Sequence, residues 1–254
     1  MNGFALKIIA LTAMIIDHTG KVLPDIFPFE ILVIGRIAFP IYVFLIAEGF
    51  YHTKNPVRFL VRLFTFAIIS ESFFDMALNG AYFSFGADGI NFFANTNIFY
   101  TLFLGGAAIT CYEYVRRKCH FVESDIKITS ALAAVTLMLG FAWLVGSAFT
   151  SDYGGYGVVF IFCMYLLRKF DLPKGFILTA MAVLSLWQYE WMFVYALTNG
   201  LAAVTNAMWL AIAVTLVPVP LAACYNGKRG PGWKWFFYWS YPAHLAVLAV
   251  VLVF

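Results

Sequence analysis

Long apolar runs follow one another along almost the whole chain, with short polar segments between them. A membrane-spanning helix needs about 20 consecutive, mostly apolar residues, and many of these runs reach that length. The composition agrees, because 63% of the 254 residues are hydrophobic and 11% are charged, whereas soluble domains are roughly half apolar and a quarter charged. The chain is therefore predicted to be an all-α, polytopic membrane protein with a single domain over residues 1–254. These features exclude a soluble enzyme, a secreted disulfide scaffold and a nucleic-acid-binding protein.

The apolar runs and the Gly, Pro and polar breaks between them predict about nine membrane spans, with eight or ten as alternatives. The run at 154–168 is short, and the segment from Trp187 to Trp191 could be an interfacial break. The first run lacks the cleavage site of a signal peptide, so it is expected to be a retained helix. The predicted spans lie near 4–23, 31–51, 58–78, 97–115, 129–149, 154–168, 175–198, 204–224 and 236–254.

The basic residues predict the orientation, because cytoplasmic loops carry an excess of Lys and Arg. With the N-terminus inside, only Lys21 and Arg36 of the 16 Lys and Arg residues fall on the outer side. This asymmetry predicts an N-in, C-out orientation with the basic loops in the cytoplasm. The four cysteines all fall in inner segments, where thiols stay reduced. Their spacing matches no zinc site, and no metal is expected.

Two ionisable residues of the first span share one helix face. Such residues are costly in lipid and usually face the interior of the protein, where they have a function. Lys7 and His18 are separated by ten residues, so their side chains point within about 20° of each other and lie roughly 16 Å apart along the axis. Lys7 is thus predicted at the cytoplasmic end and His18 beyond the membrane midplane.

The remaining polar residues sort into an acidic outer layer and a basic inner layer. A basic cytoplasmic mouth below a buried histidine suits a phosphorylated cytosolic donor whose reactive end must reach the far side. The outer layer comprises Asp17, His18, Arg36, Glu71, Asp75 and Asp152, with Gln188 and Glu190; the inner layer comprises Lys7, Glu48, His52, Arg58, Arg62, Asn226, Lys228, Arg229 and His244.

A series of motifs resembles the TraX family, the pilin acetylases of conjugative plasmids and their chromosomal relatives. More distantly, Lys7-x10-His18 resembles an element of the acyltransferase 3 and heparan-α-glucosaminide acetyltransferase families, which transfer an acyl group from cytosolic acyl-CoA. The likeness covers nearly the whole chain, and the order and spacing of the motifs carry it. They are Lys7-x10-His18, Arg36 to Thr53, Arg58-Phe-Leu-Val-Arg62, Ser70-Glu71, Asn97 to Thr101, Asp152 to Gly157, Tyr225 to Arg229 and Phe237 to His244.

The resemblance implies an integral membrane acetyltransferase that uses acetyl-CoA as its acyl donor. The acceptor would be the amine or hydroxyl of a peptide N-terminus, a sugar or a lipid head group. His18 would be the general base or an acetylated intermediate. Glu71 or Asp75 would orient the imidazole or steer a cationic acceptor, and Arg36 would stabilise the oxyanion or pair with one of those carboxylates. Asp17 adjoins His18 but points about 100° away. The donor side would comprise Lys7, Arg58, Arg62, Asn226, Lys228, Arg229 and His244, and the acceptor side Asp75, Asp152 and Tyr153.

Structural explanations compete with these roles. His18 and His244 could simply hydrogen-bond neighbouring helices. Arg58 and Arg62 could be topology anchors or contacts to anionic lipids. Glu48 and Glu71 could pair with basic side chains, and Asp152-Tyr153 could cap a helix.

A proton-coupled transporter or channel is the alternative function, with His18, Glu71 and Asp75 as a proton relay. A non-catalytic scaffold explains neither the shared face of Lys7 and His18 nor the basic inner layer.

Overall fold

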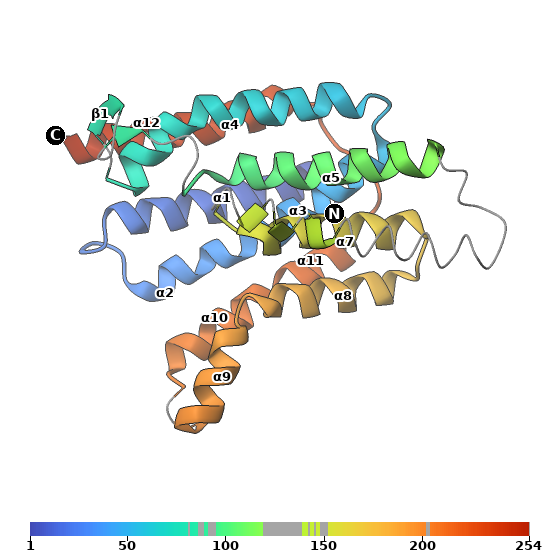
Figure 1. Cartoon of the computed structure of the whole chain (residues 1–254). Coiled ribbons are helices and arrows are strands. Elements are labelled where there is room, and N and C mark those ends of the chain that lie inside the picture. The colour runs from blue at the N-terminus through green and yellow to red at the C-terminus, as the bar shows by residue number, and fades with distance from the viewer. Residues whose placement is uncertain are drawn as a thin grey trace. The chain divides into compact units, whose positions relative to one another are not determined.

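The computed structural model describes residues 1–80, 82–85, 89–90, 95–118, 139–141, 143–144, 146–147, 152–201 and 204–253. Helices dominate the described residues, as predicted for an all-α protein, and one short pair of strands is the exception (Figure 1). The chain divides into two compact units. The first comprises Met1–Leu45 and Asp171–Phe254, and the second comprises Ile46–Phe170.

The first unit contains both ends of the chain. Its core beside α1 consists of Leu6, Ala10 and Ile41, each at most 1% exposed. Close packing holds helices together in lipid, and the small Ala10 permits it here. The elements are α1 (Gly3–Val22), α2 (Phe29–Leu32), the 3-10 helix η1 (Val33–Ile37), the first half of α3 (Ala38–His52), α8 (Lys174–Trp187), α9 (Glu190–Asn199), α10 (Asn206–Leu216), α11 (Pro218–Ala223) and α12 (Lys234–Val253).

Helices α1 and α12 lie side by side and run in the same direction (Figure 1). Phe4 near the start of α1 contacts Trp233 and Phe237, whereas His18 near its end contacts His244. If α1 and α12 both span the membrane in the same direction, the chain from α1 to α12 must cross the membrane an odd number of times.

The second unit is built around α5, which packs against both α4 and α7. Gly105 of α5 makes a close approach possible, because a Cβ there would lie 2.7 Å from the Cδ1 atom of Ile161 on α7. The strands β1 and β2 form a two-stranded parallel ladder. The elements are the second half of α3, α4 (Pro56–Leu78), β1 (Tyr82–Phe85), β2 (Gly89–Ile90), α5 (Ile98–Lys118) and α7 (Gly154–Lys169).

Five of the described helical segments are long and apolar enough to cross a membrane, or six if the bent pair α8 and α9 forms one span. The 59° bend in that pair lies between Trp187 and Glu190, where the sequence indicates a break. Helix α4 is missing from the five because it carries four charged residues, and α7 is short with 16 residues. The span at 129–149 lies mostly outside the described residues, so nine spans with an N-in, C-out orientation remain a prediction.

Gly35 gives a prediction about the packing of η1 on α1. A Cβ at this position would overlap the Asp17 side chain, and overpacking of this kind costs about 1–3 kcal/mol. We expect Gly35→Ala to lower the thermal unfolding midpoint of the purified protein in detergent. Gly175→Ala is the matched control, because no atom lies within 4 Å of the Cβ that it adds. Equal midpoints for the two variants would contradict the packing of η1 on α1.

Candidate functional site

The site in the first unit is centred on two imidazoles that α1 and α12 bring together. His18 Nδ1 lies 2.8 Å from His244 Nε2, and the two ring planes are inclined to each other by 19°. The ring of Tyr241 packs edge-on against both imidazoles. His18 is only 5% exposed, so its hydrogen bond with His244 lies inside the protein.

Lys7 faces the same helix as His18. Its Nζ atom lies 5.4 Å from the centre of the Phe237 ring on α12. Lys7 and His18 therefore share one face of α1, as their spacing predicts. A cation over an aromatic ring is attracted to the face of that ring, which holds Lys7 without neutralising its charge.

The segment before α1 is bound to the turn before α12. Gly3 N donates to Lys228 O at 2.8 Å, and Asn226 N donates to Met1 O at 2.9 Å. Asn226 Oδ1 accepts Lys228 N at 3.0 Å, so this side chain shapes the turn. These bonds attach the Lys228-Arg229 turn to the start of the helix that carries Lys7.

The result is a basic cluster of Lys7, Lys228 and Arg229. Lys7 and Arg229 lie close enough to repel each other. Within the described part of the chain, none of the three cations forms an ion pair with a carboxylate. Like charges held together without counter-ions favour an anionic ligand, and phosphate is the group that Arg and Lys commonly bind.

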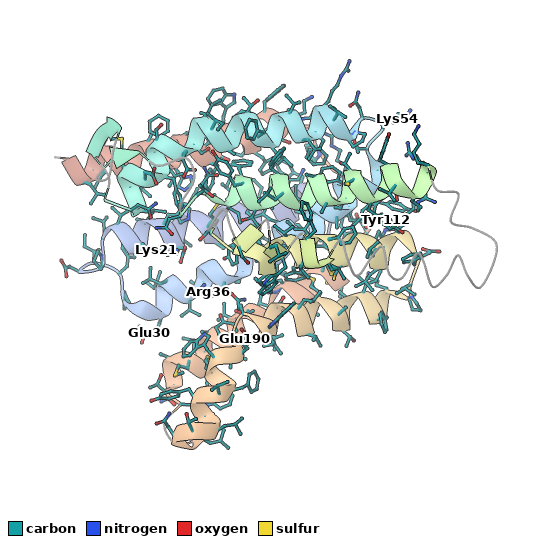
Figure 2. The ribbon with its side chains drawn as sticks, viewed as in Figure 1. Lys21, Glu30, Arg36, Lys54, Tyr112 and Glu190 are labelled. Atoms are coloured by element: carbon teal, nitrogen blue, oxygen red, sulfur yellow. The ribbon has the colours of Figure 1, made fainter. Side chains whose placement is uncertain are left out.

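Asp17 and Arg36, which the sequence predicts near His18, have other surroundings in the structure. The Asp17 carboxylate pairs with Lys21 at 2.6 Å, one turn further along α1. Arg36 lies on η1 with an exposed side chain (Figure 2). The Asp17 carboxylate thus forms an ion pair with Lys21, and the catalytic roles of Asp17 and Arg36 remain predictions.

The second unit contains a separate buried polar cluster where α4 meets the start of α5. Glu71 is fully buried, and its Oε2 atom accepts Asn97 N at 3.1 Å and Asn97 Nδ2 at 2.5 Å. Asn97 Oδ1 in turn accepts Phe99 N in the first turn of α5. Asp75 is 2% exposed and accepts Asn79 Nδ2 at 2.8 Å. Glu71 therefore links α4 to α5, which is a structural role, while its predicted action on His18 is a proposal.

This link predicts how substitutions of Glu71 affect stability. Glu71→Leu leaves the backbone N–H and one Nδ2–H of Asn97 without an acceptor, while Nδ2 still donates to Ala67 O at 2.8 Å. Each unsatisfied buried donor costs about 1–3 kcal/mol. Glu71→Gln keeps an oxygen at the same position. We expect a clear fall in the unfolding temperature for Glu71→Leu and a much smaller one for Glu71→Gln. If both variants unfold at the same temperature, the hydrogen bonds from Asn97 to Glu71 do not stabilise the fold.

Glu48 has the ion-pair partner that the structural explanation anticipates. Its Oε1 atom accepts Arg168 Nε at 2.7 Å, and its Oε2 atom lies 3.4 Å from His52 Nε2. Arg168 also stacks over the ring of Tyr51 at 4.3 Å. The pair joins α3 to α7.

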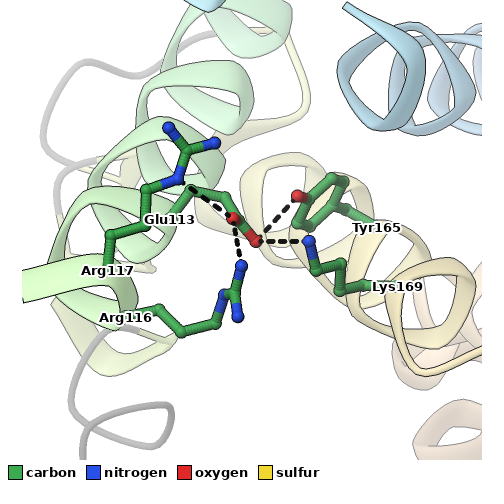
Figure 3. Close-up of polar contacts among 5 residues, drawn as sticks. All are labelled: Glu113, Arg116, Arg117, Tyr165 and Lys169. Carbon is green, nitrogen blue, oxygen red and sulfur yellow. Dashed lines mark hydrogen bonds and ion pairs between the residues drawn. The ribbon is translucent and has the colours of Figure 1, made fainter. Parts of the chain in front are cut away.

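A further charged cluster lies at the ends of α5 and α7, and sequence reasoning missed it. Glu113 pairs with Arg116 at 3.0 Å, Lys169 at 3.3 Å and Arg117 at 4.0 Å (Figure 3). Tyr165 also donates to Glu113 at 2.9 Å. From the sequence, Arg116 and Arg117 indicate only the membrane topology. Their i+3 and i+4 spacing from Glu113 places all three on one helix and does not predict a contact with α7. In the fold, Lys169 and Tyr165 of α7 contact Glu113 of α5, and these two contacts join the helices.

The predicted donor-side cations are divided between the two units. Lys7, Lys228 and Arg229 belong to the first, whereas Arg58 and Arg62 of α4 belong to the second. Arg62 stacks over Phe59 at 5.4 Å, and its Nε atom has no hydrogen-bond partner in the described structure.

On the predicted acceptor side, Asp152 N donates to Thr96 O at 2.9 Å. Tyr153 is the N-cap residue of α7 and makes no side-chain cap bond. In the described ranges, no group of three or more His, Cys, Asp or Glu side chains is placed to hold a metal ion. Cys119 and His120 lie outside those ranges.

The protein has the features of a helical membrane protein. Several of its helices are long and apolar enough to cross a membrane, and α1 and α12 enclose a pair of hydrogen-bonded imidazoles. The sequence profile described as TraX protein matches residues 2–252, and the chain belongs to the TraX family. It is also similar to the probable fimbrial assembly protein FimC, serogroup H1, of Dichelobacter nodosus. The two are 28% identical over 100% of this chain and 96% of that protein. No solved structure matches the chain.

Proposed function

We propose that this protein is a multi-pass acetyltransferase of the inner membrane that takes its acetyl group from cytosolic acetyl-CoA. The observation that carries the proposal is the shared face of α1, with an uncompensated basic cluster at one end and a buried imidazole near the other. The cluster would bind the phosphates of CoA. The pantetheine arm would extend along roughly 16 Å of helix to bring the thioester to His18.

The proposed chemistry is a direct transfer assisted by His18. The acceptor nitrogen or oxygen attacks the thioester carbonyl carbon while His18 takes the proton of the acceptor. The tetrahedral intermediate then collapses, the C–S bond breaks, and the proton passes from His18 to the CoA thiolate. The products are the acetylated acceptor and CoA. In the two-step alternative, the acetyl group first forms a bond to His18 and then moves to the acceptor.

The proposed acceptor is the amine of a fimbrial or pilin subunit, with a sugar or lipid head group as the other candidates. The name of the Dichelobacter nodosus relative connects that protein with fimbrial assembly. A subunit that is assembled from the membrane would present its amine near the outer end of α1, where His18 is predicted to lie.

Ligand-induced stabilisation tests donor binding directly. A ligand that binds only the folded state stabilises it by about 2.7 kcal/mol at 100 times its Kd, equivalent to roughly 5–10 °C for a chain of this size. We expect CoA and acetyl-CoA to raise the unfolding temperature of the protein in detergent, and pantetheine, which lacks the phosphates, to have little effect. Transfer of labelled acetyl from acetyl-CoA to a pilin-type peptide then tests activity.

The hydrogen-bonded imidazoles also suit the alternative function, a proton-coupled transporter, because such a pair can relay a proton. A transporter would show no stabilisation by CoA. It would acidify or alkalinise the lumen of proteoliposomes when its substrate is added, whereas an acetyltransferase would not.

A further inference from the structure

The ring nitrogens of His18 and His244 form a hydrogen-bonded chain that ends on the backbone. His18 Nδ1 lies 2.8 Å from His244 Nε2, and His244 Nδ1 lies 2.9 Å from the carbonyl oxygen of Ser240. Both distances are those of good hydrogen bonds. These two hydrogen bonds thus involve both ring nitrogens of His244 but only Nδ1 of His18.

The backbone carbonyl of Ser240 determines which atom is the donor in both hydrogen bonds. A carbonyl oxygen can only accept, so the proton of neutral His244 is on Nδ1 and its Nε2 atom carries the lone pair. That lone pair requires His18 Nδ1 to be the donor. Both rings are neutral in this arrangement, because His18 is buried and His244 is half-buried among apolar helices, where an uncompensated charge is costly.

We propose that His244 is a positioning residue that holds His18 in its Nδ1–H tautomer, so that Nε2 is the atom that reacts. The assignment of Nε2 follows from the geometry, and its use in acetyl transfer rests on the function proposed above. Nε2 would react in the direct and the two-step route alike. This role differs from the donor-side role that the sequence predicts for His244.

His244 would also stabilise the charged form of His18. When His18 Nε2 takes the proton of the acceptor, the ring becomes an imidazolium, and its Nδ1–H bond to His244 becomes a charge-assisted hydrogen bond. The Tyr241 ring keeps both imidazoles oriented, at centroid distances of 6.0 Å from His18 and 5.4 Å from His244. A histidine thus takes the place that a carboxylate has in a catalytic triad.

Nitrogen NMR tests the tautomer without any assay of activity. The chain contains four histidines, so selective ¹⁵N-histidine labelling in detergent gives few signals, and single substitutions assign them. We expect His18 to be in the Nδ1–H form in the unaltered protein and in His244→Gln, whose amide oxygen can still accept. In His244→Phe, which keeps a ring but has no acceptor, His18 should shift toward the Nε2–H form that imidazole side chains favour in water. An Nε2–H form in the unaltered protein, or no shift in His244→Phe, would overturn the proposal.

Kinetics test the consequence for transfer. Loss of a hydrogen bond to a charged group should lower kcat of His244→Phe by about 10- to 100-fold, with the KM for acetyl-CoA unchanged, and His244→Gln should recover most of the rate. His52→Phe, at an exposed histidine, is the control. Full activity of His244→Phe refutes the positioning role, whereas absence of transfer in the unaltered protein refutes the proposed function and leaves the NMR result valid.

Discussion

Replacing His18 with alanine is expected to lower the rate of acetyl transfer by about 100- to 10,000-fold, the range that a positioned general base contributes. Alanine cannot accept a proton, and the 5% exposure of His18 leaves little room for water to act instead. The measurement is transfer of labelled acetyl from acetyl-CoA to an acceptor peptide. Stabilisation by CoA should persist, because the proposed phosphate site lies near the other end of α1.

Two further variants separate chemistry from folding in this experiment. His18→Gln keeps a polar side chain of similar length, so it should remain folded and still be inactive. His52→Ala removes an exposed imidazole that contacts Glu48 and Tyr51, and it should retain the normal rate. Normal activity of His18→Ala or His18→Gln would show that His18 is not the base.

The second large effect is expected for the double variant Lys7→Ala/Arg229→Ala, which should bind CoA at least about 100-fold more weakly, because each charge-assisted hydrogen bond is worth about 10-fold or more. The rate at saturating acetyl-CoA should change little, since neither cation contacts the reacting atoms in the proposed mechanism. The Kd comes from the dependence of the unfolding temperature on CoA concentration.

A charge on the same helix provides the control for this effect. Lys21 is near the opposite end of α1 and pairs with Asp17 at 2.6 Å, so Lys21→Ala should leave the affinity for CoA unchanged. Removing repulsion between Lys7 and Arg229 should also make the double variant no less stable without ligand. An unchanged affinity of the double variant would exclude the basic cluster as the phosphate site.

Much of the helical pattern could be predicted from the sequence. Apolar runs with polar ends specify helices because each backbone hydrogen bond joins residues four apart. The break near Trp187 was also recognisable from the sequence, and the bend between α8 and α9 confirms it. The two strands were missed, since residues 82–90 are part of a short connection with little alternation.

The candidate site was predictable only in part. The Lys7 and His18 pairing required nothing beyond helix periodicity, and both side chains do face α12. The structural role of Glu71 depends on Asn97, which is 26 residues away, and the partner of Glu48 is 120 residues away. No local pattern encodes such pairs, so the sequence supported two explanations for each carboxylate.

The sequence by itself determined the apolar helices and the stripe of α1 that carries a cation and an imidazole, because helical geometry depends on near neighbours. Only the tertiary structure decided that His244, 226 residues from His18, completes the site and that Lys169 of α7 reaches Glu113 of α5. The reason is that these contacts form when distant helices pack, and packing depends on the shapes of whole helix faces.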